Sequence, residues 1–172
     1  MKKISLVITA AFLLLAGVNA NAQDKSKRPS QPDKVSATLA NGTEVSVDYS
    51  QPLLKGRVMG KDIEPMAGKV WRAGANEATV FEVSKDVTVQ GKALPAGKYS
   101  LYMLSGDSEW TIIFNKTADQ WGAFDYKAAD DVIRVKAKAS KGTFSEKLTY
   151  TIAKDGTVTI NWGDHKVDFK VK

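Results

Sequence analysis

The chain has 172 residues, with 25 Lys and Arg, 19 Asp and Glu, a single His, no Cys and a formal net charge of +6. This is the length of one domain. The lack of Cys excludes a disulfide framework, thiol catalysis and cysteine-held metal centres, and a single His excludes a multi-histidine metal site. We therefore expect one small globular domain with no metal and no cofactor.

The N-terminus has the pattern of a targeting segment. Two lysines precede an apolar run over residues 4–18, and residues 20–22 read Ala-Asn-Ala. A positive start, an apolar run and small residues at a cleavage site are typical of a secretory signal peptide. The run is also short for a membrane span, which needs about 20 residues. We predict a signal peptide over residues 1–22, cleavage before Gln23, and a periplasmic or secreted chain with no membrane span.

Cleavage would leave a mildly basic chain. The formal charge falls from +6 to +4, because two lysines are the only charged residues of the segment. Such a charge permits contact with acidic surfaces without requiring it. No run of five or six basic residues occurs, and an exported protein rarely meets nucleic acid, so nucleic acid is not an expected partner.

The rest of the chain alternates between apolar and polar residues in short runs. Residues 23–33 are polar, contain two prolines and predict a flexible lead-in. Residues 34–172 form the predicted domain. They contain about ten runs with the two-residue period of half-buried strands. These runs cover residues 35–39, 45–49, 80–83, 87–89, 99–103, 110–114, 132–139, 148–152, 158–162 and 167–171.

Turn-forming residues separate these runs. Asn41-Gly42 is a strong hairpin signal, and Pro95 with Gly97 suits a type I turn. Further turns are predicted at Gly142, at residues 154–156 and at Gly163. No window after the signal peptide has a helical period. We predict an all-β fold, a single antiparallel β-sandwich of jelly-roll type with about ten short strands.

One long segment interrupts the pattern. Residues 50–79 contain two prolines, four glycines and no clean alternation. The segment is far longer than a hairpin loop and too apolar to be disordered. We predict an ordered irregular loop over one end of the sandwich, where such folds place binding sites.

Several motifs carry a family resemblance. They are residues 48–52 (Asp-Tyr-Ser-Gln-Pro), 55–57 (Lys-Gly-Arg), 68–79 (Gly-Lys-Val-Trp-Arg-Ala-Gly-Ala-Asn-Glu-Ala-Thr), 94–101 (Leu-Pro-Ala-Gly-Lys-Tyr-Ser-Leu), 110–113, 115–116 and 121–122. Together they resemble the bacterial exported domain-of-unknown-function family 2911, with Gln51 standing where the family pattern has Arg. The resemblance covers nearly all of the mature chain. It implies a secreted or periplasmic β-rich domain and brings no established activity.

Polar and aromatic residues of the long loop form the candidate site. Arginine offers a planar fork of donors for a carboxylate, a phosphate or a sugar hydroxyl, and tryptophan can stack on a sugar ring. Trp110 and Trp162 lie in strand patterns and are expected in the core, whereas Trp71 and Trp121 lie in irregular segments and are expected at the surface. The candidate ligand-binding residues are Arg57, Trp71, Arg72, Asn76, Glu77 and Trp121. The alternative for Arg72 and Glu77 is a buried ion pair that fixes the loop to the sheet.

Three classes of function remain open at this point. The favoured hypothesis is a non-catalytic binding or interaction module for a glycan or a small polar molecule. A periplasmic hydrolase would use the carboxylates of residues 57–79, with Glu77 beside Arg72 and Asn76. A structural envelope protein is the third class. His165 reads as an exposed turn residue and no Gly-x-Ser-x-Gly motif occurs, so a catalytic triad is not expected.

Overall fold

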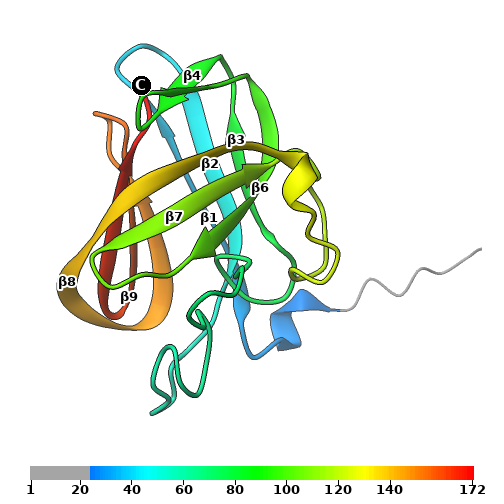
Figure 1. Ribbon diagram of the computed structural model, residues 1–172, viewed down its shortest axis with the longest axis vertical. Helices are drawn as coiled ribbons and strands as arrows, with labels where there is room; N and C mark the ends of the chain where they lie inside the picture. Colours follow the sequence, from blue (N-terminus) through cyan, green and yellow to red (C-terminus); the bar gives the residue numbers. More distant parts are fainter. Residues whose placement is uncertain (1–23) are drawn as a thin grey trace, which may run out of the picture.

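The computed structural model describes residues 24–172, and the predicted signal peptide lies outside them (Figure 1). The described part of the chain has nine strands and two 3-10 helices, and none of its helices is long and apolar enough to cross a membrane. The strands are β1 (Gln31–Thr38), β2 (Glu44–Gln51), β3 (Thr79–Val83), β4 (Val87–Val89), β5 (Lys92–Leu94), β6 (Gly97–Leu104), β7 (Glu109–Asn115), β8 (Asp131–Ile152) and β9 (Thr157–Lys170). The 3-10 helices are η1 (Lys25–Lys27) and η2 (Ala128–Asp130).

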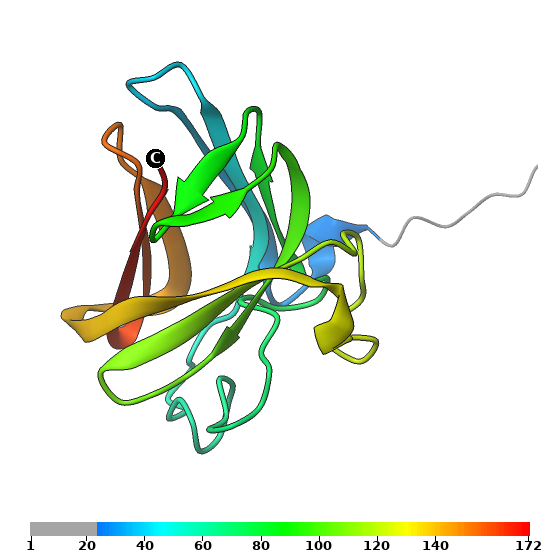
Figure 2. The same cartoon turned by 45° about the horizontal axis from the view of Figure 1, so that its top comes forward.

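Seven of the strands form one antiparallel sheet. Its order, β1-β2-β3-β6-β7-β8-β9, follows the chain, and β4 and β5 form a separate two-stranded sheet. The large sheet curls into a half-barrel around the core (Figures 1 and 2). The all-β antiparallel prediction is confirmed. The jelly-roll arrangement does not form, because the seven strands of the large sheet lie side by side in chain order, without a crossover.

Two long strands replace four of the predicted short ones. Gly142 and Gly163, predicted as turns, lie inside β8 and β9, and the register between these strands shifts twice between Lys141 and Thr149. Gly163 has a φ of +59°. Glycines and bulges let a strand bend without ending, so the chain continues around the half-barrel. His165 pairs with Lys141 in this ladder, and its assignment to a turn is wrong, although its side chain is exposed.

Backbone hydrogen bonds complete the enclosure where the sheet curls back. Leu54 N–H donates to the Glu146 carbonyl at 2.9 Å, and Leu148 N–H donates to the Pro52 carbonyl at 3.0 Å. These bonds join the chain after β2 to the second half of β8. The opposite end is closed by β4, which bonds to the last residue, Lys172, after β9. The apolar faces of the strands therefore enclose one core, with T-shaped aromatic contacts such as Phe81 on Phe114 at 5.0 Å.

The N-terminal segment belongs to the domain rather than preceding it. Residues 31–33 of the predicted lead-in pair with β2, and Asp33 accepts hydrogen bonds from Tyr49 Oη at 2.8 Å and Gln51 Nε2 at 3.0 Å. Asp24 caps η1 by accepting from the Ser26 N–H at 3.0 Å. The polar composition of this segment predicts a flexible lead-in, but side chains such as Arg28 and Asp33 form hydrogen bonds with the rest of the domain. The ordered domain therefore begins before residue 34.

Candidate functional site

Three segments meet at one end of the half-barrel: residues 24–30, the loop 52–78 and the loop 116–130 (Figure 2). Asn76 Nδ2 donates to the Ser30 carbonyl at 3.1 Å and so ties the first two segments. Gly122 N–H donates to the Asn76 carbonyl at 3.1 Å, and Ala78 N–H donates to the Gln120 carbonyl at 2.9 Å, which ties the third. All six predicted site residues lie in these segments. The long loop is ordered over the end of the sheet, as predicted.

Residues 71–76 of the loop are fixed to the sheet from both sides. Trp71 exchanges two backbone hydrogen bonds with Met103, at 2.9 and 2.8 Å, which extends the β3–β6 ladder. The Ala73 carbonyl accepts from Tyr150 Oη at 2.6 Å. At Gly74 a Cβ would lie 2.7 Å from Thr79 Oγ1, so only glycine fits this approach to the sheet. The backbone on either side of Arg72 is therefore held in place before any ligand arrives.

A cleft of about 340 Å³ opens between this turn and residues 29–30. Four of the six predicted site residues line it: Arg57, Trp71, Arg72 and Asn76. Ser30, Glu64 and Ile63 are also part of the wall. Three of the polar residues that line this cleft, Arg57, Arg72 and Asn76, are thus among the residues predicted from the sequence.

Arg72 is the least satisfied polar group of the cleft. Its side chain is half-buried, its Nε is enclosed without a hydrogen-bond partner, and none of its nitrogens donates to a residue between 24 and 172. Burial lowers the pKa of the guanidinium, and the charge of Glu64 partly opposes this. Glu64 forms no ion pair with it, and its Oε2 accepts from the Met66 N–H at 2.7 Å. The cleft wall therefore contains a cation with open donors.

Arg57 is held differently. Its Nε donates to the Leu54 carbonyl at 2.9 Å and its Nη2 donates to the Leu53 carbonyl at 2.7 Å. These bonds to carbonyls fix the direction of the side chain but leave its charge without a carboxylate. Further N–H groups of the guanidinium stay open, because an arginine carries five.

Trp71 belongs to the core, so the expectation that it lies at the surface is wrong. Only 2% of it is exposed, its ring stacks on Trp162 at 5.7 Å, and it meets Trp110 edge-on at 6.4 Å. Its Nε1 donates to the Gly74 carbonyl at 3.0 Å. The sequence around Trp71 has no strand pattern, but an isolated bridge to Met103 turns its side chain into the core. Trp110 and Trp162 are buried, as predicted.

Glu77 and Trp121 form a second cluster with Arg28. Arg28 Nη1 lies 2.8 Å from each carboxylate oxygen of Glu77, and its guanidinium carbon lies 5.7 Å from the centre of the Trp121 ring. Burial opposes the ionisation of Glu77. The bond from Arg28, a backbone N–H and the charges of Lys25 and Arg28 outweigh it and lower the pKa of Glu77. Glu77 therefore forms ion pairs with Arg28 and, at 3.5 Å, with Lys25, and not with Arg72.

Sequence reasoning missed Arg28 and Ser30, which lie in the predicted lead-in. Arg28 reaches a residue 49 positions away. No local pattern links two such positions, because the pairing of β1 with β2 and the path of the long loop bring them together. In the sequence, the motif of residues 68–79, which contains Glu77, was the signal that pointed to the cluster of Arg28, Glu77 and Trp121.

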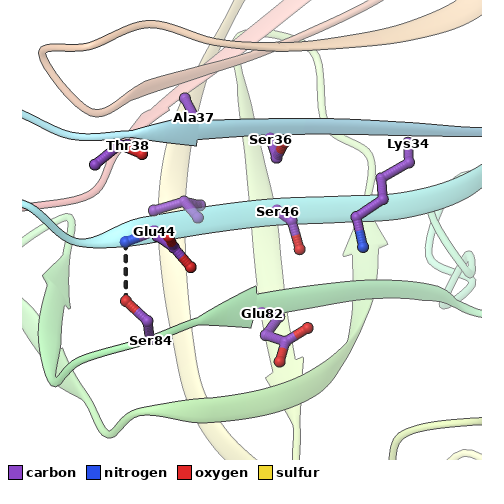
Figure 3. Close-up of a pocket in the computed structure, with 9 residues that line it drawn as sticks. Lys34, Ser36, Ala37, Thr38, Glu44, Ser46, Glu82 and Ser84 are labelled. Atoms are coloured by element: carbon purple, nitrogen blue, oxygen red, sulfur yellow. Dashed lines mark hydrogen bonds between the residues drawn. The ribbon is translucent and has the colours of Figure 1, made fainter.

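A larger hollow, of about 470 Å³, lies over β1, β2 and β3 and contains none of the predicted site residues (Figure 3). Its lining combines short polar side chains, such as Ser36 and Ser46, with the charged Lys34, Glu44 and Glu82. The charged Lys34 at its end is paired with Asp48 at 2.9 Å, and Ser84 Oγ accepts from the Glu44 N–H at 2.9 Å (Figure 3). Residues 24–172 contain no group of three or more His, Cys, Asp or Glu placed to hold a metal ion. The cleft at Arg72 is therefore the stronger candidate site.

The fold and this end of the molecule define an all-β antiparallel domain with a polar cleft beside a long pinned loop. The family model described as "Protein of unknown function (DUF2911)" matches residues 30–171. The chain belongs to this family, which confirms the resemblance carried by its motifs. No curated protein and no solved structure matches the chain.

Proposed function

We propose that this protein is an exported, non-catalytic binding module that holds a small polar molecule in the cleft at Arg72. The observation that carries the proposal is the half-buried guanidinium of Arg72, which lines the cleft without a partner among the described residues. The proposed export and periplasmic or extracellular location rest on the signal-peptide pattern of residues 1–22.

A purely structural role fits the cleft less well. Such a role predicts that the buried polar groups satisfy one another, because an unpaired charge taken from water is costly. The charges of Glu77 and Arg28 meet this expectation, because they pair with each other. Arg72 does not, and Arg57 bonds only to carbonyls. Because the N–H donors of Arg57 and Arg72 stay open, the cleft wall fits a binding role better than a purely structural one.

A hydrolase also fits less well. Glycoside hydrolysis uses two facing carboxyl groups, one of them a proton donor with a raised pKa. Among the lining residues of the cleft only Glu64 has a carboxylate. Glu77, the acid named for the hydrolase hypothesis, has both oxygens on Arg28 and a lowered pKa, which suits a permanent anion and not an acid catalyst.

Of the two expected ligands, the small polar molecule has more support than the glycan. Sugar stacking needs a free aromatic face, and Trp71 is buried. Trp121 is 53% exposed, but the Arg28 guanidinium stands over its ring. The cleft volume lies at the small end of the usual range for ligand pockets, roughly 300–1,000 Å³.

The test is an NMR titration of the ¹⁵N-labelled mature protein with glucose, glycine, acetate and benzoate, each added separately. The proposal predicts that at least one of them shifts the signals of Ser30, Arg72 and Asn76. The Ser30→Phe variant, which fills the cleft from its rim, should abolish these shifts. Shifts gathered around Trp121 with glucose would instead indicate a glycan site, and no shift at the cleft with any compound would contradict the proposal.

A further inference from the structure

The charges that line the cleft do not balance. Arg57 and Arg72 contribute two positive charges, and Glu64 contributes one negative charge. Arg72 forms no ion pair with a described residue, and Arg57 bonds to two carbonyls that carry no formal charge. The cleft therefore has an excess of one positive charge, which one anionic group would neutralise.

The open donors of Arg72 match one shape of anion. An arginine offers N–H groups of Nε and Nη in a planar fork, and a carboxylate accepts two of them side by side. The Nε is enclosed, but the two Nη groups are accessible and donate to no described residue, so a carboxylate can accept from them side by side. The pinned backbone from Trp71 to Asn76 fixes the point at which this side chain leaves the loop.

Part of the remaining wall is apolar. Pro29 and Ile63 are its accessible apolar side chains, whereas Trp71 and Trp162 lie buried behind it. A bare inorganic ion would leave these surfaces in contact with water. A ligand with an apolar body gains from covering them.

We infer that the cleft binds a small organic carboxylate, with the carboxylate on the guanidinium fork of Arg72 and an apolar body against Pro29 and Ile63. This inference rests on the proposed function and gives its ligand a chemical class. Arg57 adds positive potential to the cleft, and Ser30 and Asn76 add polar groups to its lining.

The test compares benzoate, benzamide and inorganic phosphate by calorimetry and by NMR titration. Benzamide keeps the ring and the shape of benzoate but has no charge, and phosphate keeps a charge but has no apolar body. We expect benzoate to bind at least tenfold more tightly than either. We expect Arg72→Gln to weaken benzoate at least tenfold, and Arg72→Lys, which keeps the charge and loses the fork, to weaken it several-fold.

Lys69→Gln is the matched control, since it removes one charge from the same loop at an exposed residue that does not line the cleft. It should change benzoate affinity by less than twofold. The melting temperature of each variant shows whether it folds, and Arg72→Lys tests the fork if Arg72→Gln does not fold.

The outcomes separate this inference from the proposed function. Equal binding of benzoate and benzamide at the cleft, or no effect of either Arg72 variant, overturns the carboxylate and leaves a binding module in place. Phosphate that binds as tightly as benzoate overturns the apolar body. If glucose shifts the cleft and benzoate does not, the ligand class is wrong but the site stands. If glycine shifts the cleft and benzoate does not, the carboxylate stands and the apolar body is wrong. If no compound shifts the cleft, both fall.

Discussion

Two arginines at the same end of the half-barrel have opposite surroundings. Arg28 and Arg72 are both half-buried, whereas Arg57 and Arg134 are exposed. Arg28 has both oxygens of Glu77 within 2.8 Å of its Nη1 and the Trp121 ring at 5.7 Å, although its Nε is enclosed without a partner. Arg72 has no hydrogen bond from any side-chain nitrogen within the described chain.

This difference separates the part of the site that holds the fold from the part that is free to bind. A paired, half-buried arginine fastens the N-terminal segment to the long loop, and its charge is already used. An unpaired one costs stability and is best explained by what it can bind. The two lie beside the same residues, since Pro29 and Ser30 follow Arg28 in sequence and line the cleft with Arg72. Each prediction below tests one side of this comparison.

The largest effect is expected from the tryptophans of the two clusters. Trp71→Ala should lower the free energy of unfolding by about 3–5 kcal/mol, because it removes a ring stacked in the core. Trp121→Ala, the matched change at a residue that is 53% exposed, should cost about 1 kcal/mol or less. Urea unfolding of both variants measures the difference. Similar losses would contradict the placement of Trp71 in the core and Trp121 at the surface.

A double-mutant cycle tests which arginine is paired with Glu77. Arg28→Ala should cost about 1–3 kcal/mol of unfolding free energy, because Glu77 loses a charged hydrogen-bond partner. Glu77→Ala combined with Arg28→Ala should cost less than the sum of the single changes.

The same cycle with Arg72→Ala supplies the control. Arg72 does not contact Glu77, so the double variant should equal the sum of the single changes within about 0.5 kcal/mol. A coupling energy between Arg72 and Glu77 as large as that between Arg28 and Glu77 would show that Arg72 and Glu77 do form an ion pair, and would contradict the structure.

The pH dependence of stability gives a smaller effect with a definite sign. The folded state lowers the pKa of Glu77 from its ordinary value of 4.5. The stabilisation from its ionised form is therefore complete above that value and is lost as the pH falls through the lower, folded-state pKa. The stability difference between the wild type and Arg28→Ala should be smaller at pH 3 than at pH 7. A difference that is the same at both values would show that the charge of Glu77 does not contribute.

The smallest effect concerns Asp155, far from the site. The hydrogen bond from Lys170 Nζ, at 2.6 Å, together with bonds from Thr157, lowers the pKa of Asp155 to about 2. Lys170→Met should raise it toward 3.8, as followed by NMR titration of the carboxyl carbon. Because both side chains are at the surface, the melting temperature should hardly change. An unchanged pKa in the variant would mean that Lys170 is not the main cause.

The strands could be predicted because their burial alternates along the chain. Val45, Val47 and Tyr49 face the core in β2, with partly exposed residues between them, and the two-residue period of the sequence shows this directly. The two long strands could not be predicted. Gly142 and Gly163 look like turn residues in the sequence, and they lie inside strands only because the sheet curves there. The number of sheets could not be predicted either, because it depends on which strands pair with one another and not on the sequence of any single strand.

The residues of the site could be predicted better than their partners. Arg57, Arg72 and Asn76 were chosen for their chemistry, and the structure brings them to one cleft. Their contacts depend on the distant segment that holds Arg28 and Ser30. Trp71 was misplaced because a bridge to Met103, which turns it inward, depends on a pairing 32 positions away along the chain.

The most direct test of the central claim is urea unfolding of Arg28→Gln and Arg72→Gln side by side at pH 7, because the same side chain then replaces both arginines. The account predicts a loss of about 1–3 kcal/mol for Arg28→Gln, which removes the charged hydrogen-bond donor of Glu77. It predicts that Arg72→Gln stays within about 0.5 kcal/mol of the wild type or exceeds it, since an unpaired, half-buried charge is removed. A loss in Arg72→Gln as large as that in Arg28→Gln would show that Arg72 supports the fold, and would contradict its assignment to a ligand.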